Sequence, residues 1–311
     1  MGPRLKAIAI EATDRLLRGY IRYSPIQAGR QRLWENYHRR IAWRTRIRPK
    51  IATTPFGFKV HVQLPNFIQK NIWLTGRWEP FVTECFRSIL APGDTFVDVG
   101  ANIGYYSLLA SRIVGQGGHV YAIEASPTIF ALLQKNIALN RTINVETIHA
   151  AAASREGELE FWLASETDLG HSTSVETLAS AQEMRSEGRV RSGALTSLVP
   201  VERLLNARLI KIDVEGAERA VLQPVFERLR EFSGRTAWAV ELSPSLCPSG
   251  QADVDWIFDS FCRQGYAAFT MKNDYALATY LSRPKSVEMK RIVAAPRSQA
   301  DVLFLREHAA R

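Results

Sequence analysis

Acidic side chains stand at the ends of several short apolar runs in this sequence. Asp98, Glu124 and Asp213 each close such a run, and Glu241 lies near the end of a fourth. In an open α/β sheet, ligands bind outside the carboxyl ends of the strands. If these runs are neighbouring strands, the sheet gathers carboxylates around one crevice. Such a crevice suits a ligand that carries a positive charge or several hydroxyls.

A glycine-rich turn follows the first of these runs. Gly100 and Gly104 lie between a run of β-formers, Thr95–Val99, and an apolar pattern of helical spacing over 103–114. A turn of this kind lets a ligand approach the backbone at a helix N-terminus. Glu124 ends the next expected strand, 20 residues beyond Gly104. An acid at that place can accept hydrogen bonds from both hydroxyls of a ribose.

The spacing within this turn distinguishes between nucleoside ligands. A dinucleotide site uses G-x-G-x-x-G, because the pyrophosphate must nearly touch the backbone. Here three residues separate Gly100 from Gly104, with Asn102 between them. Asp98, expected to point into the site, would repel a pyrophosphate but suit a sulfonium. S-adenosylmethionine is therefore the cofactor that fits, and an NAD(P)-dependent oxidoreductase is disfavoured.

Methyl transfer from a sulfonium needs positioning, and it needs a base when the acceptor is a hydroxyl. Asp213 is one candidate base, because it belongs to a strand end. His171 is the other, since the pKa of imidazole lies near neutrality, although an exposed loop histidine explains His171 equally well. Clustered acids could instead hold a hard cation, but no metal ligand is assigned. Acceptor contacts are expected from three further acids: Glu79, Glu215 and Glu241.

The elements that position these residues alternate between strand and helix from 94 to 270, which predicts one doubly wound parallel α/β sheet with helices on both faces. The expected strands are 95–99, 119–124, 145–149, 159–163, 209–212, 236–242, 267–270 and 301–305. The expected helices are 81–90, 103–114, 127–139, 216–230 and 252–264, with Pro224 kinking or dividing the fourth. Residues 56–64 are expected to form a hairpin or edge strand.

One internal stretch lacks a clear period. Residues 164–195 are polar and rich in serine and threonine, and we expect them to be irregular apart from a short helix near 178–185. A long irregular stretch inside a domain is typical of a lid or of disorder. The acid Glu218 has a structural explanation, because it favours a helix N-terminus.

The net charge of +9 is concentrated at the N-terminus. Residues 1–50 hold 13 Lys or Arg against 3 Asp or Glu, and the remainder has a net charge of −1. Helical spacing over 5–23 and 27–46 predicts two basic amphipathic helices. Such an arm could bind an anionic membrane surface, an acidic partner or RNA. Packing against its own domain or a second subunit is the interpretation we favour.

Two domains follow from this division: a basic helical arm over 1–50 and a larger domain over 51–311 with its core at about 80–270. No apolar run approaches the roughly 20 residues that span a bilayer. The three cysteines lack metal-binding spacing, and no secretory signal is visible. We therefore expect a cytoplasmic protein, and the charge of the arm leaves peripheral membrane attachment open as an alternative.

Several of these segments together resemble the FkbM family of S-adenosylmethionine-dependent methyltransferases. The resemblance is carried by VDVGANIG at 97–104, YAIEASP at 121–127 and IKIDVEGAE at 210–218, with GRWE at 76–79 as the lead-in. It covers roughly 55–245, and the Asp-Val-Glu-Gly segment is its most specific part. One departure is Ala125, where the family commonly has proline.

The resemblance implies a Rossmann-like methyltransferase that usually acts on a hydroxyl oxygen of a sugar, polyketide or other small metabolite. By matching position, the methionine part of the cofactor would lie along Asp98, Gly100, Asn102 and Gly104, its ribose on Glu124, and the transferred methyl beside Asp213. The alternatives are a nucleic-acid methyltransferase, suggested by the basic arm, and a non-catalytic binding protein of the same fold. The near-neutral charge of 51–311 makes nucleic acid unlikely. A homo-oligomer is compatible with the sequence.

Overall fold

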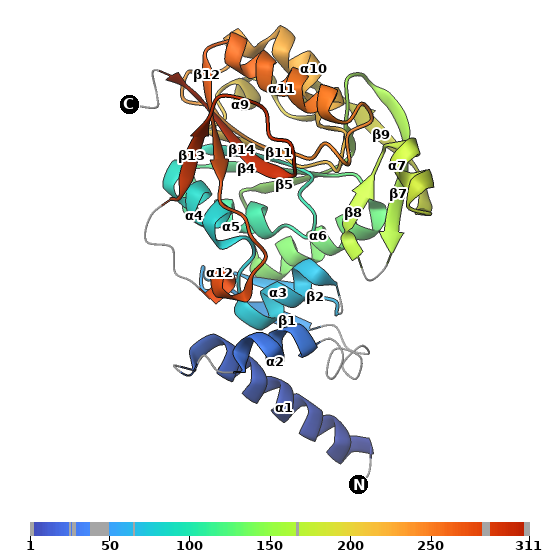
Figure 1. The fold of residues 1–311 in the computed structure, drawn as a ribbon, viewed down its shortest axis with the longest axis vertical. Coiled ribbons are helices and arrows are strands. Elements are labelled where there is room, and N and C mark those ends of the chain that lie inside the picture. Colours follow the sequence, from blue (N-terminus) through green and yellow to red (C-terminus); the bar gives the residue numbers. More distant parts are fainter. Residues whose placement is uncertain are drawn as a thin grey trace.

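The computed structural model describes residues 3–24, 26, 29–37, 50–64, 66–165, 168–281 and 287–307. Its main sheet is built from β3 (Thr95–Val99), β4 (His119–Glu124), β5 (Val145–His149), β10 (Leu209–Ile212), β11 (Ala237–Leu242), β12 (Tyr266–Met271), β13 (Met289–Ile292) and β14 (Ala300–Arg306). The spatial order is β13-β12-β14-β11-β10-β3-β4-β5. Figure 1 shows the fold.

The sheet is mixed rather than wholly parallel. β5, β4, β3, β10 and β11 pair in parallel, as the alternation of strands and helices predicts. β14 then inserts antiparallel between β11 and β12, and β13 adds an antiparallel edge. The expectation of a purely parallel sheet is therefore wrong at this end. Strand β13 was not predicted, because its burial is slight and its sequence carries no apolar alternation.

Helices cover both faces of the sheet, which confirms the doubly wound fold. One face carries α4 (Pro80–Ile89), α5 (Tyr105–Val114) and α6 (Pro127–Asn140), and the other carries α10 (Glu218–Glu227) and α11 (Gln251–Arg263). Successive residues of a strand point to opposite faces. Phe96 accordingly joins the core of the first face, and Val97 and Val99 join the core of the second. Pro224 lies inside α10, which continues past it to Glu227.

The stretch 164–195 is largely regular, so the expectation of an irregular stretch is wrong. It holds the end of β7 (Gly157–Ser165), β8 (Asp168–Thr173), α7 (Glu176–Ala181) and β9 (Arg185–Gly193), and with β6 (Ala151–Ala152) these strands form a second sheet in the order β6-β9-β7-β8. The predicted helix at 178–185 is α7, and β9 begins where that helix was expected to end. β9 has the sequence RSEGRVRSG, and backbone pairing with β7 holds it in place without an apolar pattern.

The N-terminal segment forms α1 (Pro3–Tyr23) and α2 (Arg30–Tyr37), followed by the hairpin of β1 (Lys50–Thr53) and β2 (Lys59–Val62) and by α3 (Phe67–Thr75). The first predicted helix is confirmed. The second is confirmed only over α2, and residues 38–49 lie outside the described part of the chain. No helix among the described residues is long and apolar enough to cross a membrane.

A buried polar cluster holds α1 against α3. Asp14 accepts hydrogen bonds from the Tyr37 hydroxyl and, at 3.2 Å, from Trp73 Nε1. Arg18 and Lys50 form ion pairs with the same carboxylate at 3.2 and 3.5 Å. Since α1 and α2 contribute side chains to the main core, the arm packs on the rest of the chain. The domain boundary at residue 50 stays a prediction.

Candidate functional site

A cavity of about 550 Å³ lies at the carboxyl ends of β3, β4 and β10. Its lining includes the turn after β3, the end of β4, the segment 150–152 before β7, and the residues that follow β10. Aromatic side chains from α3, from the loop after it and from the loop after β12 also line it. This volume is within the usual range for a small-molecule site. The cavity therefore occupies the position that the strand-end acids predict.

Gly100 brings the two sequence motifs into contact. Its φ is +78°, and a Cβ at this position would lie 1.8 Å from the backbone oxygen of Asp213. Gly104, with φ of +87°, instead leaves room for Leu133 of α6, whose Cδ1 would lie 2.6 Å from a Cβ. The cavity lining includes Gly100 and Asn102 but not Gly104. The glycines thus serve internal packing as well as any ligand.

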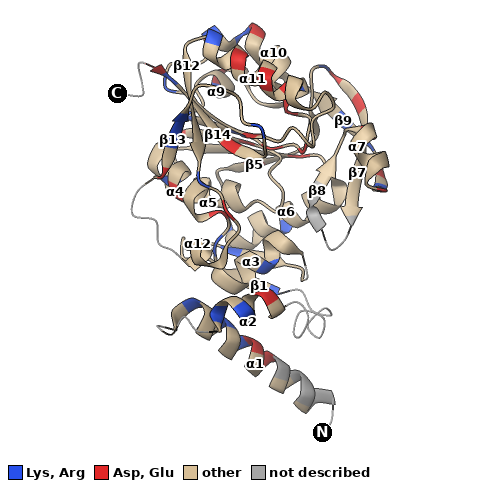
Figure 2. Ribbon diagram, viewed as in Figure 1, with Lys and Arg blue, Asp and Glu red and all other residues tan. Residues whose placement is uncertain are grey.

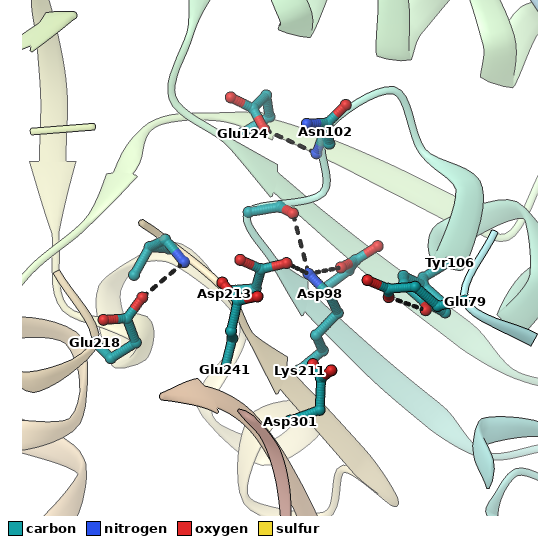
Figure 3. A network of polar contacts seen from close by, with 12 residues as sticks. Glu79, Asp98, Asn102, Tyr106, Glu124, Lys211, Asp213, Glu218, Glu241 and Asp301 are labelled. Carbon is teal, nitrogen blue, oxygen red and sulfur yellow. Dashed lines mark hydrogen bonds and ion pairs between the residues drawn. The ribbon is translucent and has the colours of Figure 1, made fainter. Parts of the chain in front are cut away.

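Glu124 is held in place by backbone amides. One carboxylate oxygen accepts an N–H bond of 2.8 Å from Asn102 (Figure 3). The other accepts an N–H bond of 2.9 Å from Ser126. Burial raises the pKa of this carboxyl to about 7, because the cost of desolvating the charge outweighs the two amide bonds. A carboxylate offers about four lone-pair sites, so two acceptor positions remain. The side chain lines the cavity and could accept bonds from two hydroxyls.

Asp98 lies beneath the cavity and does not line it. Ser107 of α5 donates a hydrogen bond of 2.6 Å to its Oδ2, and Lys211 Nζ lies 3.8 Å from its Oδ1. Burial raises the pKa of this carboxyl, and Lys211 opposes the rise. In this arrangement Asp98 ties the end of β3 to α5 and β10. A direct contact between Asp98 and a cofactor stays a prediction.

Lys211 is a buried cation at the centre of the site (Figure 3). Its Nζ donates to Asp213 Oδ2 at 2.9 Å and lies 3.4 Å from the carbonyl oxygen of Gly100. Burial alone would lower the pKa of this ammonium, but Asp213 and Asp98 reverse the sign and raise it. Lys211 therefore stays charged and holds the Asp213 carboxylate beside the cavity.

Asp213, Glu215 and Glu241 converge on the same side. One oxygen from each lies within 4.8 Å of the others, a grouping that could hold a metal ion. Gln299 donates a hydrogen bond of 2.6 Å to Glu241 Oε1. Burial, then Asp213 and Glu215, raise the pKa of the Glu241 carboxyl well above its ordinary value. Mutual repulsion of this kind is relieved by any bound cation.

Glu79 occupies the opposite wall. It adopts a left-handed backbone conformation with φ of 38° just before α4. Tyr106 donates to its Oε2 at 2.6 Å and Asn273 to its Oε1 at 3.0 Å, and Asn273 also donates to Asp301 at 2.8 Å. Burial, then the charge of Asp301, raise the pKa of Glu79 to about 8. Glu79 therefore holds a proton near neutral pH.

Three aromatic rings stand beside Glu79. Trp78 stacks on Tyr275 at 5.8 Å between centroids, and Phe67 meets both rings edge-on at 6.1 and 5.6 Å. Phe67 and Tyr275 are partly exposed, and all three line the cavity. This end of the cavity thus combines an apolar wall with carboxylates, which is suited to an acceptor that carries a ring and polar groups.

The structure brings most of the predicted site residues together. Gly100, Asn102, Glu124, Asp213, Glu79, Glu215 and Glu241 line one cavity, whereas Asp98 and Gly104 support it from behind. The side chain of His171 lies outside the described residues. Glu218 accepts the N–H groups of Val214 and Gly216 at 3.2 and 3.1 Å, as expected for an acid at a helix N-terminus.

Sequence reasoning missed Lys211 and the group of Asn273, Asp301 and Tyr275. A lysine between two isoleucines in a buried strand was a visible signal, since a charge there must find a partner. The other three come from the C-terminal third of the chain, and no local pattern connects them to Glu79.

Comparison with known proteins identifies the family. The FkbM methyltransferase domain matches residues 98–267. The chain belongs to the FkbM methyltransferase family. Methyltransferase 1 of Beauveria bassiana is 30% identical over 161 residues, 47% of this chain and 64% of that protein. Methyltransferase sdnD of Sordaria araneosa is 28% identical over 175 residues, 48% of this chain and 67% of that protein.

These matches leave part of each relative uncovered, and for Methyltransferase 1 the matched part is less than two thirds of its length. Among solved structures, M. jannaschii TYW2 in complex with AdoMet is similar at 15% identity and a TM-score of 0.43, over 83% of this chain and 86% of that one. A likeness at that score says nothing about the ligand of this chain. The matched residues 98–267 contain both sequence motifs that meet at Gly100.

Proposed function

We propose that this FkbM-family chain transfers a methyl group from S-adenosylmethionine to a hydroxyl of a small acceptor such as a sugar or a polyketide. The observation that carries the proposal is the arrangement of the cavity. Glu124, Asp213 and the aromatic rings beside Glu79 all line it. A carboxylate suited to a ribose, a candidate base and an apolar wall for an acceptor therefore share one space.

The charges of the cavity suit the cofactor. The lining contains Glu79, Glu124, Asp213, Glu215 and Glu241 but one basic side chain, Lys211. A sulfonium cation reduces the repulsion among Asp213, Glu215 and Glu241. Glu124 would accept bonds from the ribose hydroxyls, and the backbone from Gly100 to Asn102 would lie along the methionine part.

The transfer requires little covalent help from the protein. S-adenosylmethionine supplies an electrophilic methyl group. The acceptor oxygen forms the new C–O bond, the electron pair of the broken S–C bond stays on sulfur, and Asp213 accepts the hydroxyl proton. Lys211 fixes Asp213 in the orientation for this task through the 2.9 Å contact. Positioning of the two reactants provides most of the acceleration.

The same observations disfavour the alternative functions. A nucleic-acid methyltransferase needs basic residues around its active site to bind phosphates, and this cavity is acidic. A binding protein without activity would not need a carboxylate that a buried lysine holds beside the cavity. A basic amine is a second acceptor class, because the Trp78 and Tyr275 rings beside carboxylates could hold a cation.

Calorimetry with Glu124→Ala tests the cofactor assignment. The variant loses two charge-assisted hydrogen bonds to the ribose, each worth about 1.5–3 kcal/mol, and S-adenosylmethionine affinity should fall at least about tenfold. Glu156→Ala, at an exposed acid away from the cavity, should bind as the wild type does. Unchanged affinity in a folded Glu124→Ala variant would falsify the assignment.

Mass spectrometry of the reaction products tests the acceptor. The wild type is incubated with S-adenosylmethionine and a panel of sugars, polyketides and amines. A methyl group gained on oxygen supports the proposal. Methylation of amines alone would move the acceptor to the second class.

A further inference from the structure

Helix α1 presents an apolar stripe to solvent on the side opposite its packed face. Leu5, Ile8, Leu16 and Tyr23 are 58%, 63%, 75% and 73% exposed. Their spacing places them on one side of a helix of 3.6 residues per turn. Five of the twelve exposed large hydrophobic residues in the described chain lie on α1 or, as Ile26, directly after it. We call the four residues on α1 the outer stripe.

The inner side of α1 already has its partners. Ile21 is fully buried and Asp14 is 2% exposed, in the cluster with Tyr37 and Trp73. Arg22 donates to the carbonyl oxygens of Trp73 and Leu74, each at 2.7 Å, at the end of α3. Packing within the chain therefore explains one side of the helix and leaves the outer stripe unexplained. Figure 1 shows α1 extending beyond the body of the molecule.

The charge of the N-terminal segment limits which partner can cover the outer stripe. Residues 1–50 carry a net charge of +10, from 13 basic and 3 acidic residues. Figure 2 shows basic residues on both α1 and α2, and Arg15, next to Leu16, is exposed. A second copy of the same segment would meet like charge. An anionic surface would be attracted to it.

The apolar side chains of the outer stripe distinguish between the anionic partners. Nucleic acid binding depends on phosphate contacts, and four large apolar side chains contribute nothing to those. An anionic bilayer uses both features, because basic residues meet the headgroups while apolar side chains enter the boundary of the acyl chains. We propose that the outer stripe of α1 docks the protein on an anionic phospholipid surface, with α1 lying in the plane of that surface. The docking does not depend on the proposed methyl transfer.

Vesicle flotation of the full chain tests this docking. Wild type should bind vesicles of phosphatidylcholine mixed with phosphatidylglycerol, bind vesicles of phosphatidylcholine alone weakly, and lose binding as salt is raised. The triple variant Leu5→Ser, Ile8→Ser, Leu16→Ser keeps the charge and removes most of the outer stripe. Its partition onto the anionic vesicles should fall at least about tenfold.

The matched control is the double variant Ile143→Ser, Val293→Ser, which removes two exposed apolar side chains, 81% and 91% exposed, elsewhere on the molecule. It should bind as the wild type does. An unchanged melting temperature establishes that both variants fold. Equal binding by the triple variant and the wild type overturns the proposal. A wild-type dimer in light scattering that the triple variant converts to monomer also overturns it, and assigns the stripe to a second copy.

Discussion

At the scale of the residue, Lys211 supplies the positive charge that compensates the buried acids of the site. It is 8% exposed, and it compensates two carboxylates, of Asp98 and Asp213, at 3.8 and 2.9 Å. A buried ion pair broken by the loss of one partner leaves an uncompensated charge, whereas a pair removed as a whole can be nearly neutral. The stability of the site should therefore depend on the lysine and the acids together.

Lys211→Met tests this dependence. The variant should lose about 3–5 kcal/mol of unfolding free energy, because Asp98 remains buried without its cation. Urea denaturation measures the loss. Lys135→Met, at an exposed helical position of α6, should change it little. The double variant Lys211→Met, Asp98→Asn should recover part of the loss, and no recovery would contradict the pairing.

Asp213→Asn tests the proposed base. It keeps the shape of the side chain, so S-adenosylmethionine affinity should change little. Turnover should fall by about 10²–10⁴, the usual contribution of a positioned proton acceptor. Single-turnover kinetics with the acceptor found in the panel provide the measurement.

Two companion measurements separate the alternatives to that base. Full activity in Asp213→Asn together with loss in His171→Ala would move the base to β8. Loss of wild-type turnover in a chelator, with recovery on adding magnesium, would make Asp213, Glu215 and Glu241 metal ligands instead.

At the scale of the element, the turn after β3 lies so close to the residue after β10 that a Cβ at Gly100 would lie 1.8 Å from the backbone oxygen of Asp213. Gly100→Ala should cost at least about 2 kcal/mol, because it adds strain at φ of +78° and a clash with the backbone of Asp213. Two matched variants, compared in thermal or urea unfolding, separate the cost of the backbone strain from the cost of the clash. Gly93→Ala has a positive φ but open space, and Gly117→Ala has neither problem. Equal losses of unfolding free energy in Gly100→Ala and Gly93→Ala would show that the structure relieves the clash with Asp213 at no cost.

The sequence predicted the elements that bury an apolar face and failed on those that do not. β3, β4, β10 and α11 lie within a residue or two of their expected bounds, because each has a strong period or a clear cap. β8 and β9 are polar strands whose stability comes from pairing with β7, and such pairing leaves no local pattern. The antiparallel insertion of β14 depends on contacts across the whole sheet, so its place could not be predicted.

At the scale of the whole molecule, the site was predictable where one chain segment supplies both the strand and its acid. Glu124 and Asp213 are of this kind. Asn273 reaches Glu79 from 194 residues further along the chain and also contacts Asp301, which lies more than 200 residues beyond Glu79. Only the folded sheet brings these residues together. The outer stripe of α1 shows the converse case. Its amphipathic pattern was visible, but the sequence could not separate the packed side from the exposed side.

The buried acids give the ligand-free protein a distinctive pH dependence. Burial is the main cause that raises the pKa of Glu79 to about 8, of Glu124 and Glu218 to about 7, and of Asp301 to about 6. Above the ordinary carboxyl pKa, the unfolded chain releases protons that the folded protein keeps. These groups therefore make their full contribution to the free energy of unfolding below about pH 4.5. That contribution falls as the pH rises through their pKa values in the folded protein.

Urea denaturation across that range should therefore show stability decreasing from about pH 5 to about pH 8. Glu79→Gln cannot titrate, so its curve should be flatter than that of the wild type near pH 8. Saturating S-adenosylmethionine should flatten the wild-type curve as well, because a cation in the cavity stabilises the ionised acids. Stability that rises over this range in the ligand-free protein, or a Glu79→Gln curve as steep as the wild type, would show that the acids are ionised in the folded state.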